Sequence, residues 1–271
     1  MNQFKLITLA ATLALGAATA RAAAISEVDY GALTGATITF SGLAEGDIDG
    51  LLTLGGVQFG ERFDGQELAY TLAPRPGSSP PAQDRFDNLS FGSPLAGLTL
   101  LAGAAGANLG AYDYGDVHGV ALFGAGADAS YAAGLGAISA RFAAPVSALG
   151  FQLRDVDGGA VTLSLYRLDG SLIQHVDLSG RTDGFFAFAR AGGTADIAGF
   201  SLTNSDSYYG VSMDNLRLSA APVPEPATAL LLLAGLLTLG AWRATDPKPD
   251  RRPGAVMRRP PAEASTLNLE T

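Results

Sequence analysis

Two aspartates one residue apart precede a pair of glycines in the stretch Asp155-Val156-Asp157-Gly158-Gly159. Carboxylate oxygens gathered on one side of a turn are ligands that a hard cation such as Ca²⁺ prefers. Asp214, further along the chain, is the third candidate ligand for the same calcium site. The spacing does not match an EF-hand loop, because the third acid and the closing glutamate of that motif are missing. The alternative is that these aspartates only stabilise a turn.

Two segments combine tyrosines with acids and amides, a composition typical of saccharide-binding surfaces. They are Tyr112-Asp113-Tyr114 and the run from Asn204 to Tyr209. Both fall in loop-like stretches, where binding groups tend to lie, and aromatic rings offer apolar faces with a polar tip. The candidate saccharide contacts are Tyr112, Tyr114, Tyr208 and Tyr209. The alternative is that these rings cap the ends of the core with their hydroxyls in water.

The side chains needed for nucleophilic catalysis are scarce. The chain has two histidines, His118 and His175, and no cysteine. His175 falls inside a predicted strand, which indicates a solvent-facing residue, and no nucleophile-elbow, dinucleotide or P-loop motif is present. The many aspartates and glutamates could supply a carboxylate pair for a glycoside hydrolase, but the same acids also serve as solvated turn residues. We therefore expect no catalytic residues and a protein that is not an enzyme.

Short runs of β-type residues separated by turn residues occupy residues 25–220. In AVTLSLYR (160–167), Val161, Leu163 and Leu165 face one way and the residues between them face the other, as in a half-buried antiparallel strand. The dipeptide Asp169-Gly170 predicts a tight hairpin turn. Four prolines predict a loop over residues 73–82. The predicted strands are 35–40, 51–59, 119–123, 137–142, 146–153, 160–167, 171–178, 185–189, 197–203 and 208–219.

The number and spacing of these strands predict an all-β fold, an antiparallel β-sandwich of jelly-roll type. The 35 glycines, which follow no G-X-Y period, indicate many tight turns. Residues 25–221 carry 21 acidic side chains against 9 arginines and no lysine. A surface of that sign repels phosphate backbones, so we expect no nucleic-acid partner.

The N-terminus has the three parts of a secretory signal peptide. Lys5 precedes an apolar stretch from Leu6 to Ala18, and small residues suited to cleavage follow it. Residues 1–22 are therefore expected to be removed by signal peptidase after passage through the Sec translocon.

A second apolar segment near the C-terminus predicts a membrane-spanning helix over residues 227–243. Ala227 to Trp242 contains no charged residue and is rich in leucine. As a helix it would extend about 24 Å, slightly less than the bilayer core of about 30 Å. Trp242 lies where an interfacial aromatic is favoured, and Arg243 after it would act as the membrane stop. A buried core helix is the alternative, although the segment lacks a polar face.

The residues around this segment resemble a known sorting signal. Pro224-Glu225-Pro226 directly precedes the apolar helix, and arginine follows it. This order is similar to the PEP-CTERM signal of bacterial surface and secreted proteins that exosortases process. The resemblance implies an exported domain (25–220), a linker with the PEP motif (221–226), transient anchoring in the inner membrane of a Gram-negative cell, and an exosortase-type protease as partner. The tail from 244 to 271 departs from the family pattern, and its prolines predict disorder in the cytoplasm.

The resemblance also implies a function. Members of this family are associated with exopolysaccharide and biofilm, so we expect a non-enzymatic component of that matrix at the cell surface or outside the cell. A carbohydrate-binding module, with or without calcium, is the alternative, and a glycoside hydrolase is a further one. Apart from calcium, no cofactor is expected.

Overall fold

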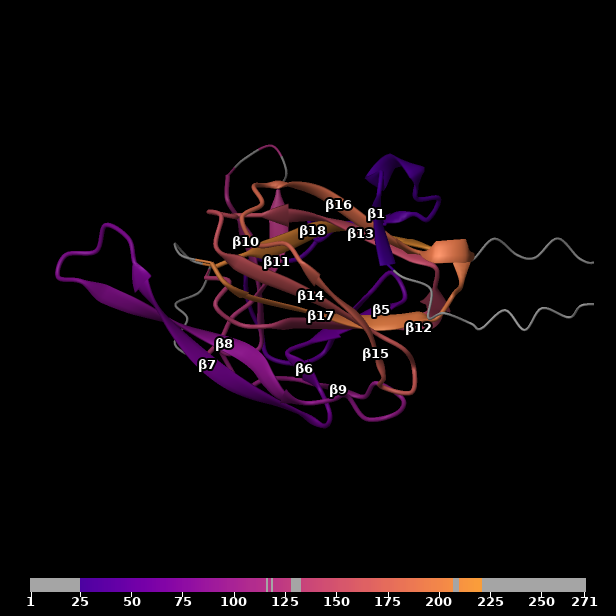
Figure 1. Cartoon of the computed structure of the whole chain (residues 1–271). Coiled ribbons are helices and arrows are strands. Elements are labelled where there is room, and N and C mark those ends of the chain that lie inside the picture. The colour runs from indigo at the N-terminus through magenta and orange to yellow at the C-terminus, as the bar shows by residue number, and fades with distance from the viewer. Residues whose placement is uncertain (1–24, 116, 118, 128–132, 207–209, 221–271) are drawn as a thin grey trace, which may run out of the picture. The chain divides into compact units, whose positions relative to one another are not determined.

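The computed structural model describes residues 25–115, 117, 119–127, 133–206 and 210–220. These residues form β-strands and two short 3-10 helices, η1 (Tyr30–Ala32) and η2 (Ala191–Gly193), and this part of the chain contains no α-helix (Figure 1). Every pairing between the named strands is antiparallel. The all-β, antiparallel prediction is confirmed.

The larger sheet has eight strands in the order β1-β16-β13-β18-β11-β10-β3, with β2 paired to β18 beside this path. Its strands are β1 (Ile25–Val28), β2 (Thr37–Ile38), β3 (Gly46–Ile48), β10 (Leu109–Asp113), β11 (Val120–Gly124), β13 (Ala148–Arg154), β16 (Gly184–Arg190) and β18 (Ser212–Ser219).

The second sheet has six strands in the order β15-β14-β17-β12-β5-β4, and two further pairs, β6-β9 and β7-β8, form small sheets of their own. The six strands are β4 (Leu52–Leu54), β5 (Val57–Gly60), β12 (Ile138–Val146), β14 (Ala160–Tyr166), β15 (Leu172–Asp177) and β17 (Ile197–Ser205). The small sheets consist of β6 (Arg62–Phe63) with β9 (Leu100–Leu101), and β7 (Gln66–Arg75) with β8 (Ala82–Gly92).

One apolar cluster contains side chains from both large sheets. Phe151 of β13 and Phe200 of β17 are fully buried, and their rings stack with centroids 6.3 Å apart. The ring centroid of Phe142 of β12 lies 6.0 Å from that of Phe200, on the same side of the six-stranded sheet. Burial of this apolar area is the main favourable term that holds the two sheets together.

The alternating pattern in residues 160–167 is confirmed. Val161, Leu163 and Leu165 lie in the core, and the residues between them lie on the other face of β14. The Asp169-Gly170 turn joins β14 to β15, and Gly170 adopts a φ of 83°, which a glycine accepts without strain. The predicted strand 51–59 is instead a hairpin of β4 and β5, because glycines 55 and 56 both adopt positive φ and reverse the chain.

The predicted loop at residues 73–82 is wrong at both ends. β7 continues through Pro74 to Arg75 and β8 begins at Ala82, so the two strands form one long hairpin, drawn in purple in Figure 1. A proline fits in an edge strand where its missing N–H faces away from the partner strand.

Several predicted segments lie outside the described residues. These are the signal peptide (1–22), the motif Pro224-Glu225-Pro226, the helix at 227–243 with Arg243, and the tail (244–271). Within the ranges that the structure describes, no helix is both long and apolar enough to cross a membrane. The signal peptide and the membrane helix stay predictions.

Candidate functional site

Residues 155–159, here called the acidic loop, connect β13 to β14. Asp155 follows the last residue of β13 and has a φ of 60°, a left-handed conformation that aspartate and asparagine tolerate better than most residues. Its side chain is half-buried, whereas Asp157 is exposed. The stretch is therefore a loop between two strands, and whether its aspartates serve only to stabilise the chain reversal stays a prediction.

Two acids that the sequence pattern did not single out hold the acidic loop in place. Asp206 at the end of β17 is fully buried, and its carboxylate accepts hydrogen bonds from the backbone N–H groups of Asp157 (2.6 Å) and Gly159. Asp183 accepts from the backbone N–H of Val156 at 2.8 Å. A Cβ on residue 159 would lie 2.2 Å from the Asp206 carboxylate, so this position requires glycine. The carboxylates thus bind the backbone of the loop.

The concentration of negative charge changes the acidity of Asp155. Burial, together with the charges of Asp157, Asp183 and Asp206, raises the pKa of Asp155 to about 6. Tyr114 lies next to this carboxylate. Burial, with a smaller contribution from the charge of Asp155, raises the pKa of the Tyr114 hydroxyl to about 12. Near neutral pH the loop therefore holds a carboxylate whose charge destabilises the fold.

Replacing Asp155 with asparagine is expected to stabilise the protein at neutral pH by about 1 kcal/mol, allowing for solvent screening of this half-exposed group. Because the folded-state pKa of about 6 exceeds the ordinary value of 3.8, the folded protein holds the proton more tightly than the unfolded chain does. The contribution of Asp155 to stability therefore falls as the pH rises from about 4 to about 6 and is level above that range.

Urea unfolding across this pH range measures the effect, with the exposed Asp64→Asn as a control of equal charge change. The Asp155→Asn curve should diverge from wild type between about pH 4 and pH 6, while the control curve stays parallel. Parallel curves for both variants would show that Asp155 titrates as an ordinary surface acid.

Asp214 lies in β18 opposite Gln152 of β13. Its buried carboxylate accepts hydrogen bonds from the backbone N–H groups of Phe40 (3.2 Å) and Asn215 (2.7 Å). These partners differ from those of Asp155 and Asp157. Within the described ranges, no group of three or more acidic or histidine side chains is arranged to hold a metal ion. The calcium site therefore stays a prediction.

The structure places two of the four candidate tyrosines. Tyr112 in β10 and Tyr114 just after it are half-buried, and their rings meet edge to face with centroids 5.1 Å apart. The guanidinium carbon of Arg154 lies 5.0 Å from the centroid of the Tyr114 ring. Tyr208 and Tyr209 fall outside the described residues. The two placed rings therefore pack mainly against protein, and saccharide contact through all four tyrosines stays a prediction.

A concave site, here called the polar groove, lies between the base of the β7–β8 hairpin and the outer face of the six-stranded sheet. Its volume is about 260 Å³. It is lined by Gln66, Leu89, Ser90, Phe91, Gly92, Thr162, Ser164, Tyr166, His175 and Thr203. Hydroxyl groups dominate this set, and it contains no aspartate, glutamate, lysine or arginine.

A β-bulge in β8 shapes one wall of the groove. Glu67 and Leu68 of β7 pair with Phe91 and Leu89, so Ser90 is the extra residue on β8. Successive residues of a regular strand point to opposite faces, but a bulge redirects them, and four consecutive residues, 89–92, line the groove here. Phe91 is 64% exposed, which is unusual for a phenylalanine, and it belongs to none of the buried apolar clusters.

Neutral hydrogen bonds fix the floor of the groove. The Gln66 side-chain amide donates to the Tyr166 hydroxyl at 3.1 Å, and its carbonyl accepts from the backbone N–H of Phe63 at 3.0 Å. Burial raises the pKa of Tyr166, so its hydroxyl stays protonated. The Ser164 hydroxyl lies 2.8 Å from Nδ1 of His175. The groove thus presents positioned donors and acceptors, and its lining contains no acidic residue, lysine or arginine.

The contact between Ser164 and His175 invites comparison with a hydrolase. A serine nucleophile also needs a group that orients the histidine and donors that stabilise an oxyanion. Among the described residues, no carboxylate hydrogen bonds to His175. His175 lies on the exposed face of β15, as its strand pattern predicted. The arrangement is suited to binding, and the absence of enzymatic activity stays a prediction.

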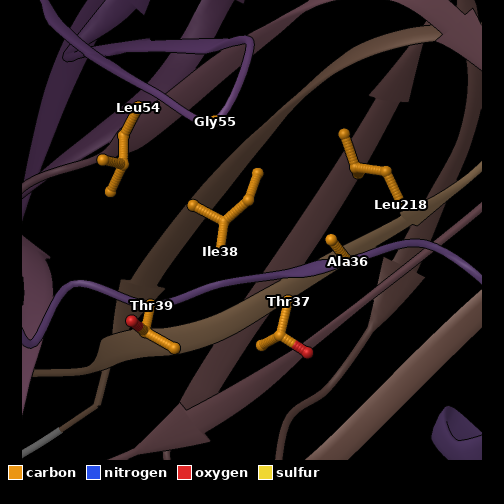
Figure 2. A pocket seen from close by; sticks show the side chains of 7 residues that line it. All are labelled: Ala36, Thr37, Ile38, Thr39, Leu54, Gly55 and Leu218. Carbon is orange, nitrogen blue, oxygen red and sulfur yellow. The ribbon is translucent and has the colours of Figure 1, made fainter.

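Another cavity, here called the apolar cavity, has a volume of about 460 Å³ and lies where β2 and the β4–β5 turn approach β18. Figure 2 shows Ile38 directed between Leu54 and Leu218, with Thr37 pointing the other way. Its lining has no charged or ionisable side chain. This cavity offers apolar surface but no group that could perform or direct chemistry.

The acidic loop, the polar groove and the apolar cavity are three places in the domain where side chains of one kind gather. No protein-family model matches the chain, and no curated protein matches it at a significant level. Function is therefore inferred from the residues themselves. Of these three places, the polar groove combines concavity, positioned polar groups and an exposed aromatic ring.

Proposed function

We propose that the protein is an exported, non-enzymatic component of an extracellular polysaccharide matrix and that it binds neutral saccharide in the polar groove. The observation that carries this proposal is the lining of the groove, which is rich in hydroxyls, has no acidic residue, lysine or arginine, and includes the exposed ring of Phe91. A sugar ring has the matching chemistry, since it carries hydroxyls around its edge and C–H groups on its faces.

The two kinds of surface in the groove suit the two kinds of surface on a sugar. Thr162, Ser164 and Thr203 bring hydroxyls that both donate and accept hydrogen bonds. Phe91 offers a flat apolar face against which the C–H groups of a pyranose can stack. Acidic polysaccharides fit less well, because the net negative charge of the domain repels them.

The proposal includes a sandwich architecture, and the shared core supports it. Phe151 and Phe200 from the two sheets stack in one apolar cluster, as in a pair of sheets packed face to face. We propose a jelly-roll-like β-sandwich whose outer face, on the six-stranded side, carries the groove.

Export and sorting belong to the same proposal and rest on the sequence signals. The protein passes the Sec translocon, is held in the inner membrane by the helix at 227–243, and is cut by an exosortase-type protease near Pro224-Glu225-Pro226. Intact mass spectrometry of the exported protein tests this. A product that lacks residues 1–22 and ends near the motif supports the proposal, and a product that retains residues 227–271 contradicts it.

Replacing Phe91 with alanine is expected to weaken saccharide binding by about tenfold or more, because the stacking surface is lost. The probes are immobilised neutral glucan, mannan and galactan, with acidic alginate for comparison, each with and without calcium. Binding to a neutral polysaccharide should not need calcium, since no carboxylate lines the groove.

Phe185→Ala is the matched control, because Phe185 is also an exposed phenylalanine, at 50% exposure, but lies on β16 of the other sheet. Its affinity should equal that of wild type. Binding to alginate alone, binding to none of the probes, or equal affinity of the Phe91→Ala variant and wild type would refute the groove as the saccharide site.

A further inference from the structure

The β7 strand has an open edge. β7 and β8 form a sheet of two strands, and within the described part of the chain β7 pairs with no strand besides β8. The outer edge of β8 is partly covered, since the backbone N–H of Asp87 donates to the carbonyl of Leu135 at 2.8 Å. Figure 1 shows the hairpin extending away from the larger sheets, with its tip beyond them. Among the described residues, no strand pairs with the outer side of β7, so its backbone groups face a position where a further strand fits.

This edge is only weakly protected against pairing with another chain. Protected edge strands are short, bulged, or carry proline or charged residues. The one proline of β7, Pro74, lies near the end of the strand. β7 has 10 residues, and the bulge of the hairpin lies in β8. The centre of β7 carries exposed apolar side chains, Tyr70 at 59% and Leu72 at 51% exposure. Its charged residues, Glu67 and Arg75, lie toward its two ends.

The order of residues along β7 is self-complementary. When two copies of the strand are aligned antiparallel about Thr71, Glu67 of each copy faces Arg75 of the other. Tyr70 then faces Leu72, and Ala69 faces Ala73. Cross-strand pairs of opposite charge, and of an aromatic with an aliphatic side chain, are the ones that stabilise antiparallel sheets. A shift of the alignment loses the charge pairs.

We propose that the protein forms a two-fold symmetric dimer in which β7 of one copy pairs antiparallel with β7 of the second copy, centred on Thr71. The result is a four-stranded sheet in the order β8-β7-β7-β8. An isolated two-stranded hairpin is marginally stable in water, and two additional strands remove that weakness. The same surface of each copy makes the contact, as in most closed dimers.

Pro74 indicates which backbone groups form the new hydrogen bonds. It pairs with Gln83 of β8 but has no N–H, so its nitrogen belongs on the outer side of β7. Tyr70 and Leu72 lie four and two residues before Pro74. Alternate residues of a strand direct their backbone groups to the same side, so the N–H and C=O groups of Tyr70 and Leu72 also point outward. In the proposed alignment, Tyr70 of each copy exchanges two hydrogen bonds with Leu72 of the other.

Sedimentation velocity of the protein, purified as the cell produces it, tests the proposal. Wild type is expected to be a dimer at micromolar concentration. Thr71→Lys places two like charges opposite each other at the symmetry axis and should raise the dimer dissociation constant at least about tenfold. Thr182→Lys adds the same charge in an exposed loop and should leave the dimer intact.

Single cysteines test the register, because the chain has none of its own. Thr71→Cys places its thiol opposite the thiol of the second copy, and mild oxidation should link the two chains in high yield. Glu67→Cys lies eight residues from its own counterpart along the paired strands, about 26 Å away, and should not cross-link. A monomeric wild type, a Thr71→Lys variant that dimerises as well as wild type, or equal cross-linking of the two cysteine variants would overturn the proposal.

Discussion

Replacing Phe200 with alanine is expected to lower the free energy of unfolding by about 3 to 5 kcal/mol, the range for removing a buried aromatic side chain. Phe200 has no exposed surface, and its ring contacts Phe151 of the opposite sheet and Phe142 of its own. The change would leave a cavity lined by side chains from both sheets. Urea unfolding at neutral pH, monitored by tyrosine fluorescence, measures the loss.

Phe185→Ala is the control, because its exposed ring contributes little to the core and should cost less than about 1 kcal/mol. If Phe200→Ala does not fold, Phe200→Leu keeps most of the volume and should cost about 1.5 kcal/mol or less. A loss below about 1 kcal/mol for Phe200→Ala would show that Phe200 is not packed between the sheets.

Replacing Asp206 with alanine is expected to lower the free energy of unfolding by about 2 to 4 kcal/mol. The carboxylate accepts hydrogen bonds from the backbone N–H groups of Asp157 and Gly159, and both donors would lose a charged acceptor. Hydrogen exchange of the acidic loop should accelerate as well, because these bonds hold it against the end of β17. Chemical denaturation and exchange mass spectrometry measure the two effects.

Asp206→Asn keeps one carbonyl acceptor, so its loss should be about half that of alanine. Asp157→Ala removes an exposed side chain from the same loop but leaves the backbone bonds in place, and should change stability by less than about 0.5 kcal/mol. Similar values for Asp206→Ala and Asp157→Ala would contradict a structural role for Asp206.

The sequence predicted the strands of the second half of the domain well. In residues 160–167 the alternation between Leu163 and Ser164 reports the face on which each side chain lies, because one face of β14 meets the core and the other meets the groove. Likewise the Asp169-Gly170 turn needs only local chemistry, since a positive φ at Gly170 depends on neighbours within the hairpin.

The β7–β8 hairpin could not be predicted in the same way. Prolines in residues 73–82 predicted a loop, and residues 76–81 do form the tip of the hairpin. Whether Pro74 belongs to a strand depends on which side of β7 is unpaired, and that is a property of the sheet. A proline inside a strand is compatible with an edge position, but it does not show by itself that the segment is a strand.

The candidate sites were predicted in part. Asp155 and Asp157 do share a turn, but the acids that bind the turn come from distant segments, Asp183 and Asp206. The polar groove was missed because its residues come from β7, β8, β14, β15 and β17 and form no motif. The bulge at Ser90, which brings consecutive residues to one wall, has no signature in the chain.

Hydrogen–deuterium exchange of the protein with and without a bound neutral polysaccharide tests the groove most directly. The account predicts slower exchange at residues 89–92 of β8, 162–166 of β14 and 203 of β17, which line the groove from three strands. Protection confined to the acidic loop and residues 112–115, with the groove unchanged, would contradict it.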